Sequence, residues 1–575
     1  MSSCIPIKRT MTGRNASEAI HRRSSMMWQL IDWGRATLIV KSLQARIVKA
    51  VQAHNWKNIR DLQRLLNHST SAKVLAIRRV TENTGKRTAG VDGELWDSPK
   101  RKYDSIKGLK NQGYKASPVR RIKIPKSNGK MRPLGIPTMQ DRAMQALHLL
   151  GLDPISETLG DKNSYGFRPY RSCADAITKC HKILSRRTSA VWILEGDIKG
   201  CFDNISHDWL LKNIPMNKGV LSQWLKSGYM EKGKFYDSES GTPQGSVISP
   251  TLSNMVLDGL SKRLDEALGI QRRDNYYKNP YKVHLIRYAD DFIVTASDKS
   301  ILSKKVKPII EVFLDERGLE LSESKTKITH INDGFDFLGK HLRKYHGKLI
   351  IKPSKTNVKE FLRKVQETIR KHRSSKTSTL IGLLTPKIRG WCMYHRMDCS
   401  KQTFAYVDHR IWKMLWQWAL RRHPMKSKGW LKQRYFKRSK GVDWTLFAYD
   451  ENSRLLTLMR ASQVSIQRHI IIRGAANPYD VNDELYFEGR ADQLMRNNIA
   501  GRNLLLCLYN RQKGFCSICH QKLTKQTGAH IHHKIPKYLG GKSNMENLVL
   551  LHPVCHMQLH HGIKKVTTVA LTISV

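Results

Sequence analysis

The stretch LIRYADDFIV, residues 285–294, decides how the rest of the chain is interpreted. Its apolar residues on both sides predict a buried strand or hairpin, yet Asp290 and Asp291 stand side by side at its centre. Two adjacent carboxylates in an apolar setting repel each other and lose hydration, which is costly unless a positive group pairs with them. The stretch therefore predicts a cationic partner, and the remaining sequence limits what that partner is.

The composition indicates a folded protein that binds a polyanion. The chain has 575 residues, too many for one core, so we expect two to four domains. Its formal net charge is +54, from 101 Lys plus Arg against 47 Asp plus Glu, and its hydrophobic fraction of 40% excludes a mostly disordered basic tail. Nucleic acid is the first candidate for the polyanion, and an anionic membrane surface is a weaker second.

Two further features bear on the compartment. No apolar run reaches the length of a transmembrane helix, and the stretch MSSCIPIKRTMTGRN lacks the apolar region of a signal peptide, so we expect a cytoplasmic protein with no membrane partner. The ten cysteines are scattered apart from one CxxC, Cys516 and Cys519. This pattern is typical of a reducing cytosol with a local metal site rather than of a disulfide framework.

The hydrophobic periodicity predicts a multidomain α+β chain. Basic amphipathic helices are expected from about residue 355, where apolar residues repeat on one face among Lys and Arg. The predicted order is helices over 36–80, a loop at 88–93, two basic strands over 119–138 around a turn at Asn128-Gly129, a helix over 139–160, alternating strands and helices to about 345, the basic helices, a Trp-rich segment, and a less regular connector over 441–500.

The simplest partner for the aspartate pair is a pair of Mg²⁺ ions. Hard divalent cations prefer carboxylate oxygens, and two metals about 3.5–4 Å apart can clamp both oxygens of a phosphoryl displacement. Such a site needs a further carboxylate, and Asp197, which ends the apolar stretch VWILEGD, supplies one; Asp203 is a candidate fourth acid. A lone acidic pair would be better interpreted as a solvated turn or a salt bridge, but here two apolar runs each carry acid.

Six further segments extend this pattern, and together with YADD they resemble bacterial group II intron-encoded proteins. The upstream Asp197 and YADD are similar to a reverse transcriptase palm, and TPKIRGWCMYHR is similar to the maturase domain of the same family. The ordered segments are PKSNGKMRPLGIPTMQDRAMQ (125–145), NSYGFRPYRSCADAI (163–177), GTPQGSVISPTLSNMVLD (241–258), GLELSESKTKITHI (318–331), GFDFLGKHLRKY (334–345) and TPKIRGWCMYHR (385–396).

The resemblance implies a right-hand reverse transcriptase with fingers and palm, an α-helical thumb and maturase domain, and a small ββα-metal (HNH) zinc domain. The implied domains are an N-terminal helical extension over 1–80, fingers over 81–190, palm over 191–345, thumb and maturase domain over 346–430, a connector and DNA-binding region over 431–500, and an HNH endonuclease domain over 501–565.

The resemblance also assigns roles in the polymerase site. Asp197, Asp290 and Asp291 would bind two Mg²⁺ ions, helped by the backbone carbonyl of Ile198. Phe202 matches the bulky gate that crowds a 2′-hydroxyl and so favours dNTPs. The alternative for Phe202 is an ordinary place in the hydrophobic core.

Four more residues would contact the incoming nucleotide. By the same resemblance, Gln244 and Gly245 line the nucleotide pocket, and Lys126 and Arg132 grip the triphosphate. A triphosphate needs several cations, and Arg can bind it through two hydrogen bonds. The alternative for Lys126 and Arg132 is an ordinary basic hairpin, because Lys and Arg are so frequent in this chain.

The Trp-rich segment has two interpretations. Trp and Tyr can stack on unpaired bases. However, Trp412, Leu415, Trp416 and Trp418 lie in an apolar helical segment, and core packing is the better interpretation for most of them. The resemblance, not the tryptophans, is what implies recognition of intron RNA by this region and the N-terminal helices.

The segment GFCSICHQKLTKQTGAHIHHKIPKYLGGKSNMENLVLLHPVCHMQLHH resembles an HNH nuclease. Cys516 and Cys519 form a CxxC knuckle, and His552 and Cys555 would complete a tetrahedral structural Zn²⁺ site. The family more often has CxxC at both places, so His552 is a departure that still preserves a zinc-ligating residue type.

The nuclease site would be separate from the zinc site. His533 matches the general base that activates water, and Asn547 matches the residue that orients that histidine. His532, His556 and His560 match ligands of a catalytic divalent metal, and the last two are four residues apart, which places them on one helical face. The alternative is a zinc module that binds DNA without cutting it.

Taken together, the resemblance implies an RNA-directed DNA polymerase, splicing maturase and site-specific DNA endonuclease that acts in intron mobility by target-primed reverse transcription. Its expected partners are group II intron RNA, double-stranded target DNA, dNTP and an RNA template with a DNA primer, and its expected location is the bacterial cytoplasm, with nucleoid association when it acts on DNA. The rivals are a splicing maturase with a vestigial polymerase, which the intact Asp197 and YADD argue against, and a host or defence reverse transcriptase, which the maturase and HNH segments argue against.

Overall fold

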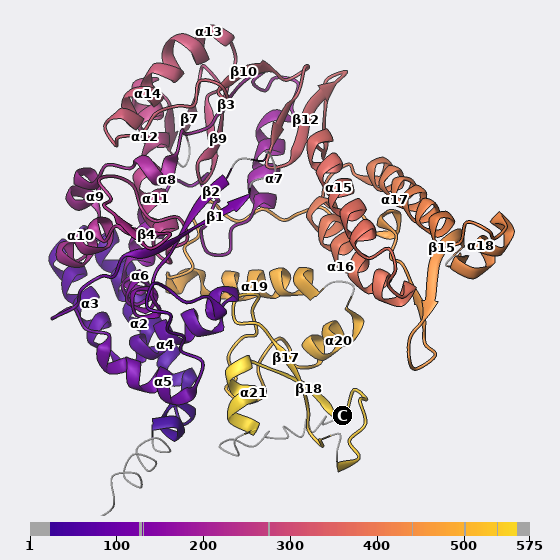
Figure 1. The fold of residues 1–575 in the computed structure, drawn as a ribbon. Helices are drawn as coiled ribbons and strands as arrows, with labels where there is room; N and C mark the ends of the chain where they lie inside the picture. The colour runs from indigo at the N-terminus through magenta and orange to yellow at the C-terminus, as the bar shows by residue number, and fades with distance from the viewer. Residues whose placement is uncertain are drawn as a thin grey trace, which may run out of the picture.

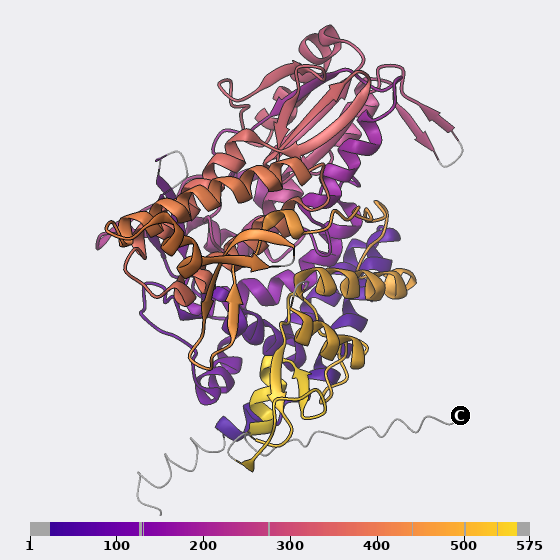
Figure 2. The same ribbon diagram turned by 90° about the vertical axis from the view of Figure 1, so that its right-hand side faces the viewer.

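The computed structural model describes residues 24–125, 129, 131–273, 276–439, 441–499, 502–536 and 539–560. Lys126, predicted to grip the triphosphate, lies outside these residues. In Figures 1 and 2 the helices that follow residue 355 project to one side of the N-terminal helices and palm, and the C-terminal domain lies beside the N-terminal helices.

The N-terminal region is a helical layer built around one long helix. Helix α2 begins after Asp32, whose carboxylate accepts a hydrogen bond from the backbone N–H of Arg35 at 3.1 Å, so the helix start is capped. α2, α3 and α4 pack against α6, and the helices predicted over 36–80 and 139–160 are confirmed. Their bounds are α2 (Trp33–Gln52), α3 (Trp56–His68), α4 (Thr70–Glu82) and α6 (Met139–Leu159).

A basic hairpin forms one side of the fingers sheet, with β2 at its edge. Strands β1 and β2 pair antiparallel, with Ile124 opposite Arg132, as predicted. Asn128 of the predicted turn lies outside the described residues. The sheet order is β2-β1-β4-β5, and β4 lies parallel to β1. The strands are β1 (Val119–Pro125), β2 (Met131–Ile136), β4 (Tyr229–Glu231) and β5 (Lys234–Tyr236).

The palm is an antiparallel sheet of order β10-β3-β9-β8. The inner positions of β3, β8 and β9 are buried. LIRYADDFIV is therefore two strands and a turn, because β8 ends at Tyr288 and β9 begins at Asp291. The strands are β3 (Trp192–Gly196), β8 (His284–Tyr288), β9 (Asp291–Ala296) and β10 (Lys327–His330).

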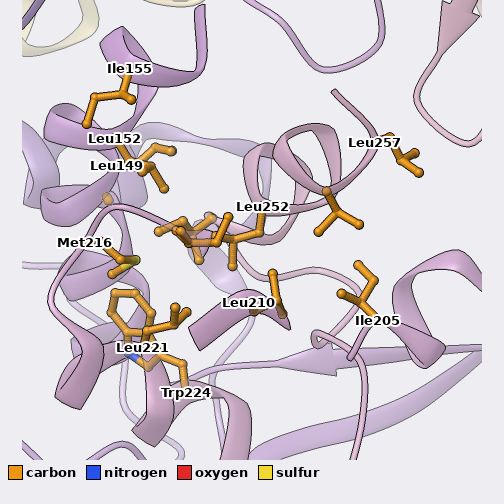
Figure 3. Packing of buried hydrophobic residues seen from close by; sticks show 14 of the residues in the cluster. Leu149, Leu152, Ile155, Ile205, Leu210, Met216, Leu221, Trp224, Leu252 and Leu257 are labelled. Carbon is orange, nitrogen blue, oxygen red and sulfur yellow. The ribbon is translucent and has the colours of Figure 1, made fainter. Parts of the chain in front are cut away.

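Fingers and palm share one hydrophobic core. Leu149 and Leu152 of α6 lie near Leu252 of α11, and Leu221 and Trp224 of α10 close the same cluster (Figure 3). This continuity makes the palm a rigid platform whose stability does not depend on its surface carboxylates. The helices around the palm are α7 (Cys173–Leu184), α8 (Cys201–Asn204), α9 (His207–Asn213), α10 (Lys218–Lys226), α11 (Ser249–Leu257), α12 (Leu260–Ala267), α13 (Lys299–Ile301) and α14 (Lys307–Asp315).

The thumb is a helical bundle with its own core. The apolar face predicted for α15, including Phe361 and Val365, is buried against α16 and α17. Leu415 and Trp418 are buried in this core as predicted, whereas Trp412 and Trp416 are only partly buried at its edge. The helices are α15 (Lys355–Lys371), α16 (Thr377–His395), α17 (Lys401–Arg422) and α18 (Lys428–Tyr435).

The region predicted as an irregular connector, 441–500, contains regular structure and is anchored. The helix α19 (Glu484–Ile499) packs back on the palm, where Arg490 Nη2 lies 2.7 Å from the buried carboxylate of Asp175 on α7. His469 Nε2 contacts the same carboxylate at 2.9 Å. The local sequence pattern missed this anchoring because its partner lies some 300 residues earlier in the chain.

Short elements complete the chain. A small sheet of order β11-β12-β13 joins palm to thumb, β14-β15-β16 follows the thumb, and β17-β18 forms the C-terminal hairpin. The remaining elements are η1 (Thr84–Arg87), α5 (Pro99–Asp104), η2 (Ser105–Gly108), β6 (Gln271–Arg273), β7 (Tyr276–Lys278), the π-helix η3 (Leu302–Val306), β11 (Phe335–Phe337), β12 (Lys340–Tyr345), β13 (Lys348–Pro353), β14 (Phe436–Ser439), β15 (Val442–Tyr449), β16 (Leu455–Thr457), η4 (Ala461–Gln463), η5 (Val481–Asp483), α20 (Asn503–Arg511), β17 (His530–His533), β18 (Leu548–Leu551) and α21 (Pro553–His560).

Candidate active sites and metal centres

Strand register brings the three predicted palm aspartates together. β3 pairs antiparallel with β9 so that Gly196 faces Phe292, and the next residue, Asp197, therefore lies beside Asp291. A Cβ added at Gly196 would come within 2.2 Å of the Phe292 ring, so only glycine allows that ring to pack under the site. The backbone of Ile198, whose carbonyl was predicted to assist, forms an isolated bridge with Leu321.

The aspartate pair lies at the palm surface rather than inside a strand. Ala289 takes a left-handed backbone conformation, φ +57°, in the turn that carries Asp290. Asp290 is half-buried and Asp291 is exposed, which corrects the expectation of a buried pair. The turn presents both carboxylates where ions and substrate from solution can reach them.

The carboxylates nonetheless raise one another's affinity for protons. The pKa of Asp291 rises to about 6 because neighbouring protein desolvates it and because Asp290 and Asp197 add negative charge. The pKa of Asp290 is also raised, first by desolvation and then by Asp197, while Arg132 and Lys325 partly offset the effect. A site with this excess of negative charge fits divalent cations through its donor set.

Lys325 is a residue of this site that sequence reasoning missed. Its Nζ lies 2.5 Å from Asp197 Oδ2. The contact follows from the strand register, in which Lys327 of β10 faces Glu195 of β3. In an antiparallel pair, two residues back along β10 and two residues forward along β3 bring Lys325 opposite Asp197. Nothing in the local pattern shows that β10 pairs with β3.

The predicted nucleotide residues lie where palm and fingers meet. The backbone of Gln244 accepts a hydrogen bond from Gly135 N of β2 at 2.7 Å, and Gly245 has φ +106°. The Gln244 side chain donates to both oxygens of Asp203, at 3.1 and 3.2 Å. The Gln244 amide thus holds Asp203 in place, and the role of Asp203 as a candidate fourth acid stays a prediction.

Two other predicted residues flank this loop. Phe202 on α8 is half-buried, and its ring meets the ring of exposed Phe167 edge-on at 6.4 Å, so Phe202 lies outside the buried core. Arg132 is exposed on β2, near enough for its charge to lower the pKa of Asp290. A cavity of about 290 Å³ lined by Arg121, Asp203 and Gln244 lies alongside.

The predicted zinc ligands converge in the C-terminal domain. The ligand atoms of Cys516, Cys519, His552 and Cys555 all lie within 4.8 Å of one another. Burial alone would lower the pKa of His552, but hydrogen bonds and charge from Cys516 and Cys519 raise it to about 9. Four sulfur and nitrogen donors this close could bind zinc, with His552 at the place where the family more often has cysteine.

A second cluster of three histidines lies apart from the zinc ligands. The ring nitrogens of His532, His556 and His560 also lie within 4.8 Å of one another. His532 comes from β17, and the other two come from successive turns of α21, as their spacing predicted. Burial and the neighbouring imidazoles lower the pKa of His532 to about 4, so this histidine stays neutral and ready to bind a metal.

The predicted general base lies on the opposite side of β17. His533 Nε2 is 3.0 Å from the hydroxyl oxygen of Ser543, a contact that sequence reasoning missed. Asn547 stabilises the loop between β17 and β18. Its Oδ1 accepts a hydrogen bond from Ile535 N at 2.7 Å, and its Nδ2 donates one to Lys542 O at 2.8 Å. Among the described residues no side-chain hydrogen bond joins Asn547 to His533, so any orienting effect acts through the backbone.

Helix α21 also docks on the N-terminal region. The Gln558 side chain is buried and donates to the backbone carbonyls of Gln29 at 2.7 Å and Ile31 at 3.1 Å. Val554 joins the same hydrophobic cluster as Trp33. The helix that carries two of the three clustered histidines is therefore fixed to the polymerase half of the chain.

The aspartates at the ends of the inner strands β3 and β9 of an antiparallel palm sheet, with a basic fingers hairpin beside them, define a nucleic-acid polymerase of the reverse transcriptase class. Family comparison agrees: residues 124–342 match reverse transcriptase (RNA-dependent DNA polymerase) and residues 28–109 match its N-terminal domain. Residues 358–436 match the group II intron maturase-specific domain, and residues 516–562 match HNH endonuclease. The chain belongs to the group II intron-encoded proteins, multifunctional enzymes that join reverse transcriptase, maturase and HNH endonuclease.

Individual relatives support this assignment. Protein YkfC of Escherichia coli K12 is 34% identical over 343 residues, which are 53% of this chain and 88% of that protein. Group II intron-encoded protein LtrA of Lactococcus lactis subsp. cremoris is 28% identical over 425 residues, 58% of this chain and 70% of that protein. An uncharacterized 91 kDa protein in a cob intron of Schizosaccharomyces pombe is 29% identical over 322 residues, 47% of this chain and 40% of that protein. Within the part of the chain described above, no helix is long and apolar enough to cross a membrane.

Proposed function

We propose that the protein inserts its own group II intron RNA into double-stranded DNA by target-primed reverse transcription. The RNA joins one strand by reverse splicing, the HNH domain nicks the other, and the polymerase copies the RNA from that 3′ end with dNTPs. The protein works in the bacterial cytoplasm and on nucleoid DNA. One observation carries the proposal. The palm carboxylates precede the maturase domain in the sequence, and a separate cluster of three histidines follows it in the same chain.

In the polymerase site, the residues bind and select the nucleotide. Mg²⁺ held by Asp197, Asp290 and Asp291 would supply Lewis-acid stabilisation of phosphoryl transfer. Arg132 faces the same carboxylates from the fingers, where its guanidinium would hold the triphosphate. The half-buried ring of Phe202 would crowd a 2′-hydroxyl and so discriminate against ribonucleotides.

In the nuclease site, His533 would take the proton from the attacking water. When Nε2 carries its hydrogen toward the Ser543 hydroxyl, Nδ1 is the nitrogen with a free lone pair. A divalent ion held by His532, His556 and His560 would lower the pKa of the water and stabilise the phosphate. The Cys516 cluster would hold zinc and keep the domain folded.

The test uses the protein purified with the RNA that it binds. That RNA is sequenced, and a duplex containing the corresponding insertion site is labelled on each strand and incubated with the complex and dNTPs. We expect RNA joined to one strand, a nick in the other, and new DNA continuous with the nicked 3′ end. RNA joining without any copied DNA would instead support a splicing maturase with a vestigial polymerase, and complex treated with ribonuclease is the control.

A further inference from the structure

A cavity of about 520 Å³ separates the thumb helix α17 from the sheet that follows the thumb. Trp412 and Leu415 of α17 form one wall, and Trp444 and Leu446 of β15 form the other. The α17 wall lies within the segment that matches the maturase domain. The cavity is remote in sequence from both proposed metal sites and has no part in either chemistry.

Trp444 is held in a backbone conformation that costs energy. The pairing of β14 with β15 shifts between Lys437 and Ser439, and Trp444 lies in the resulting bulge with φ +62°. A left-handed backbone is unfavourable for a bulky residue and easy for glycine. Bulges redirect side chains, and strain of this kind marks functional positions, so this conformation indicates that the position of the indole matters.

The indoles around the cavity form an aromatic corner. The Trp444 ring lies 5.8 Å from the Trp412 ring at 80° and 5.4 Å from the Trp416 ring at 86°, whereas Trp412 and Trp416 are nearly parallel at 14°. A planar ring can therefore stack on one indole face and meet another at its edge. Trp412 Nε1 is buried and has no hydrogen-bond partner among the described residues, so one donor is left for a ligand.

The surroundings of the cavity are cationic. Lys432 Nζ lies 5.0 Å from the centroid of the Trp444 ring, and Arg460 lines the cavity. Asp408 also lines the cavity, but its carboxylate already accepts two backbone N–H groups of η4, at 2.7 and 2.9 Å, and lies 3.7 Å from Arg460. Asp408 is the only acid in α17, and α18 and β14 carry Lys and Arg without any acid. A second acid of the lining, exposed Asp443 on β15, pairs with Arg438 at 3.9 Å.

We propose that this cavity captures a single unpaired base of structured RNA, which stacks at Trp444 while the adjoining phosphates meet Lys432 and Arg460. An aromatic corner with an unused donor fits a heterocycle that carries acceptors, and the cationic rim fits its phosphates. The proposal rests on the proposed function in one respect, because it takes RNA as the partner of the maturase domain.

The probe is a short RNA hairpin with one bulged 2-aminopurine, compared with the same hairpin in which that base is paired. Full-length wild-type protein should bind the bulged hairpin roughly tenfold more tightly and quench its fluorescence, since stacking on one indole contributes about that much. Trp444→Gly should abolish the preference and the quenching, leave affinity for the paired hairpin unchanged, and keep or raise the melting temperature, because glycine accepts the left-handed backbone.

Trp430→Ala is the matched control. Trp430 is another exposed indole of the same region, with Lys426 Nζ 5.6 Å from its ring centroid, but it does not line the cavity. This variant should keep the full preference for the bulged base. An equal loss in both variants, or an unchanged preference in Trp444→Gly, overturns the proposal, as does a preference seen only with the corresponding DNA hairpin.

The failure of this proposal is separable from failure of the polymerase assignment. Primer extension on an annealed RNA template should proceed at the wild-type rate in Trp444→Gly. The variant with both Asp290→Ala and Asp291→Ala should keep the preference for the bulged hairpin while losing extension. A wild-type protein that extends primers yet binds both hairpins equally overturns the cavity proposal alone.

Discussion

The palm carboxylates and the C-terminal Cys/His clusters are both candidate metal centres, but they relate to the folded core in opposite ways. Asp290 and Asp291 lie at the solvent-facing end of a sheet whose core is complete without them. In contrast, Cys516 and Cys555 are fully buried members of the small cluster that forms the core of the C-terminal domain. A ligand on the surface of an existing core serves chemistry alone, whereas a ligand within the core also serves folding.

The two regions also differ in how their charges are balanced. In the palm, carboxylates repel one another, and the pKa of Asp291 is raised to about 6, so the folded protein tolerates these groups at a cost. In the zinc cluster, hydrogen bonds from Cys519 and Cys555 lower the pKa of Cys516, which favours the thiolate form that binds metal. Removing ligands should therefore leave the palm folded and unfold the C-terminal domain.

The largest expected effect is that of Cys516→Ala. Metal binding supplies about 10 kcal/mol or more of folding free energy in small zinc domains, so we expect the domain around β17 and β18 to unfold and all nicking to stop. Mass spectrometry measures the zinc content, and the loss of a low-temperature unfolding transition shows that the domain is unfolded. Primer extension should persist. Cys507→Ala, at an exposed cysteine on α20, is the control and should retain zinc. A Cys516→Ala protein that stays folded without zinc would show that these ligands do not serve folding.

The double substitution Asp290→Ala and Asp291→Ala should remove polymerase activity and leave the protein folded. Primer extension on an RNA template should be abolished, because two of three ligands for the catalytic ions are removed. The melting temperature at pH 7 should stay the same or rise, since repelling carboxylates are gone. Asp208→Ala, an exposed acid on α9, should change neither quantity. Normal cDNA yield from the double variant would show that these residues do not hold the catalytic ions.

The sequence anticipated these elements unequally, and the reason is physical. The β1–β2 hairpin, α6 and the i, i+4 histidines of α21 follow from local signals: a turn dipeptide, apolar periodicity and helical spacing. Lys325 and the contact between Gln244 and Asp203 were missed because long-range pairing brings these residues together. Strand pairing between distant segments leaves little trace in either segment alone.

The same limit explains the connector. Residues 441–500 appeared irregular because α19 gains much of its stability from contacts on the palm, such as that between Arg490 and Asp175. Helix propensity is a weak guide when tertiary packing supplies the stabilisation. The bulge that holds Trp444 is likewise invisible to propensity, which would place a tryptophan in an ordinary strand.

A third effect tests whether the two centres act independently. His533→Ala should reduce second-strand nicking by roughly 10²–10⁴-fold, the usual contribution of a general base, while primer extension and zinc content stay at wild-type values. Ser543→Ala should reduce nicking less, because it removes only the contact that holds the imidazole. Lys534→Ala, at an exposed neighbour, is the control. Undiminished nicking by His533→Ala would leave the C-terminal domain as a DNA-binding module.

A smaller effect is expected at Phe202 on the polymerase side. Phe202→Ala should admit ribonucleotides more readily, with discrimination reduced by roughly 10–200-fold, while dNTP incorporation continues. Single-nucleotide incorporation with matched dNTP and rNTP measures the ratio. Phe167→Ala removes the ring that packs on Phe202 and should have a weaker effect of the same sign. A collapsed melting temperature with unchanged discrimination would instead assign Phe202 to packing.

The smallest effect concerns the contact that joins the two regions. Gln558 is buried and donates to the carbonyls of Gln29 and Ile31, so Gln558→Leu leaves both acceptors without their donor. Because the Gln558 Oε1 atom has no partner among the described residues, its removal offsets part of the loss, and we expect a net destabilisation of about 1 kcal/mol. The C-terminal transition should shift down by a few degrees, measured by calorimetry, with primer extension unchanged. Met557→Leu, at the exposed neighbouring position on α21, should shift nothing. If Gln558→Leu instead lowered the polymerase transition by the same amount, the two regions would unfold as one cooperative unit, and the distinction between a surface site and a core site would fail.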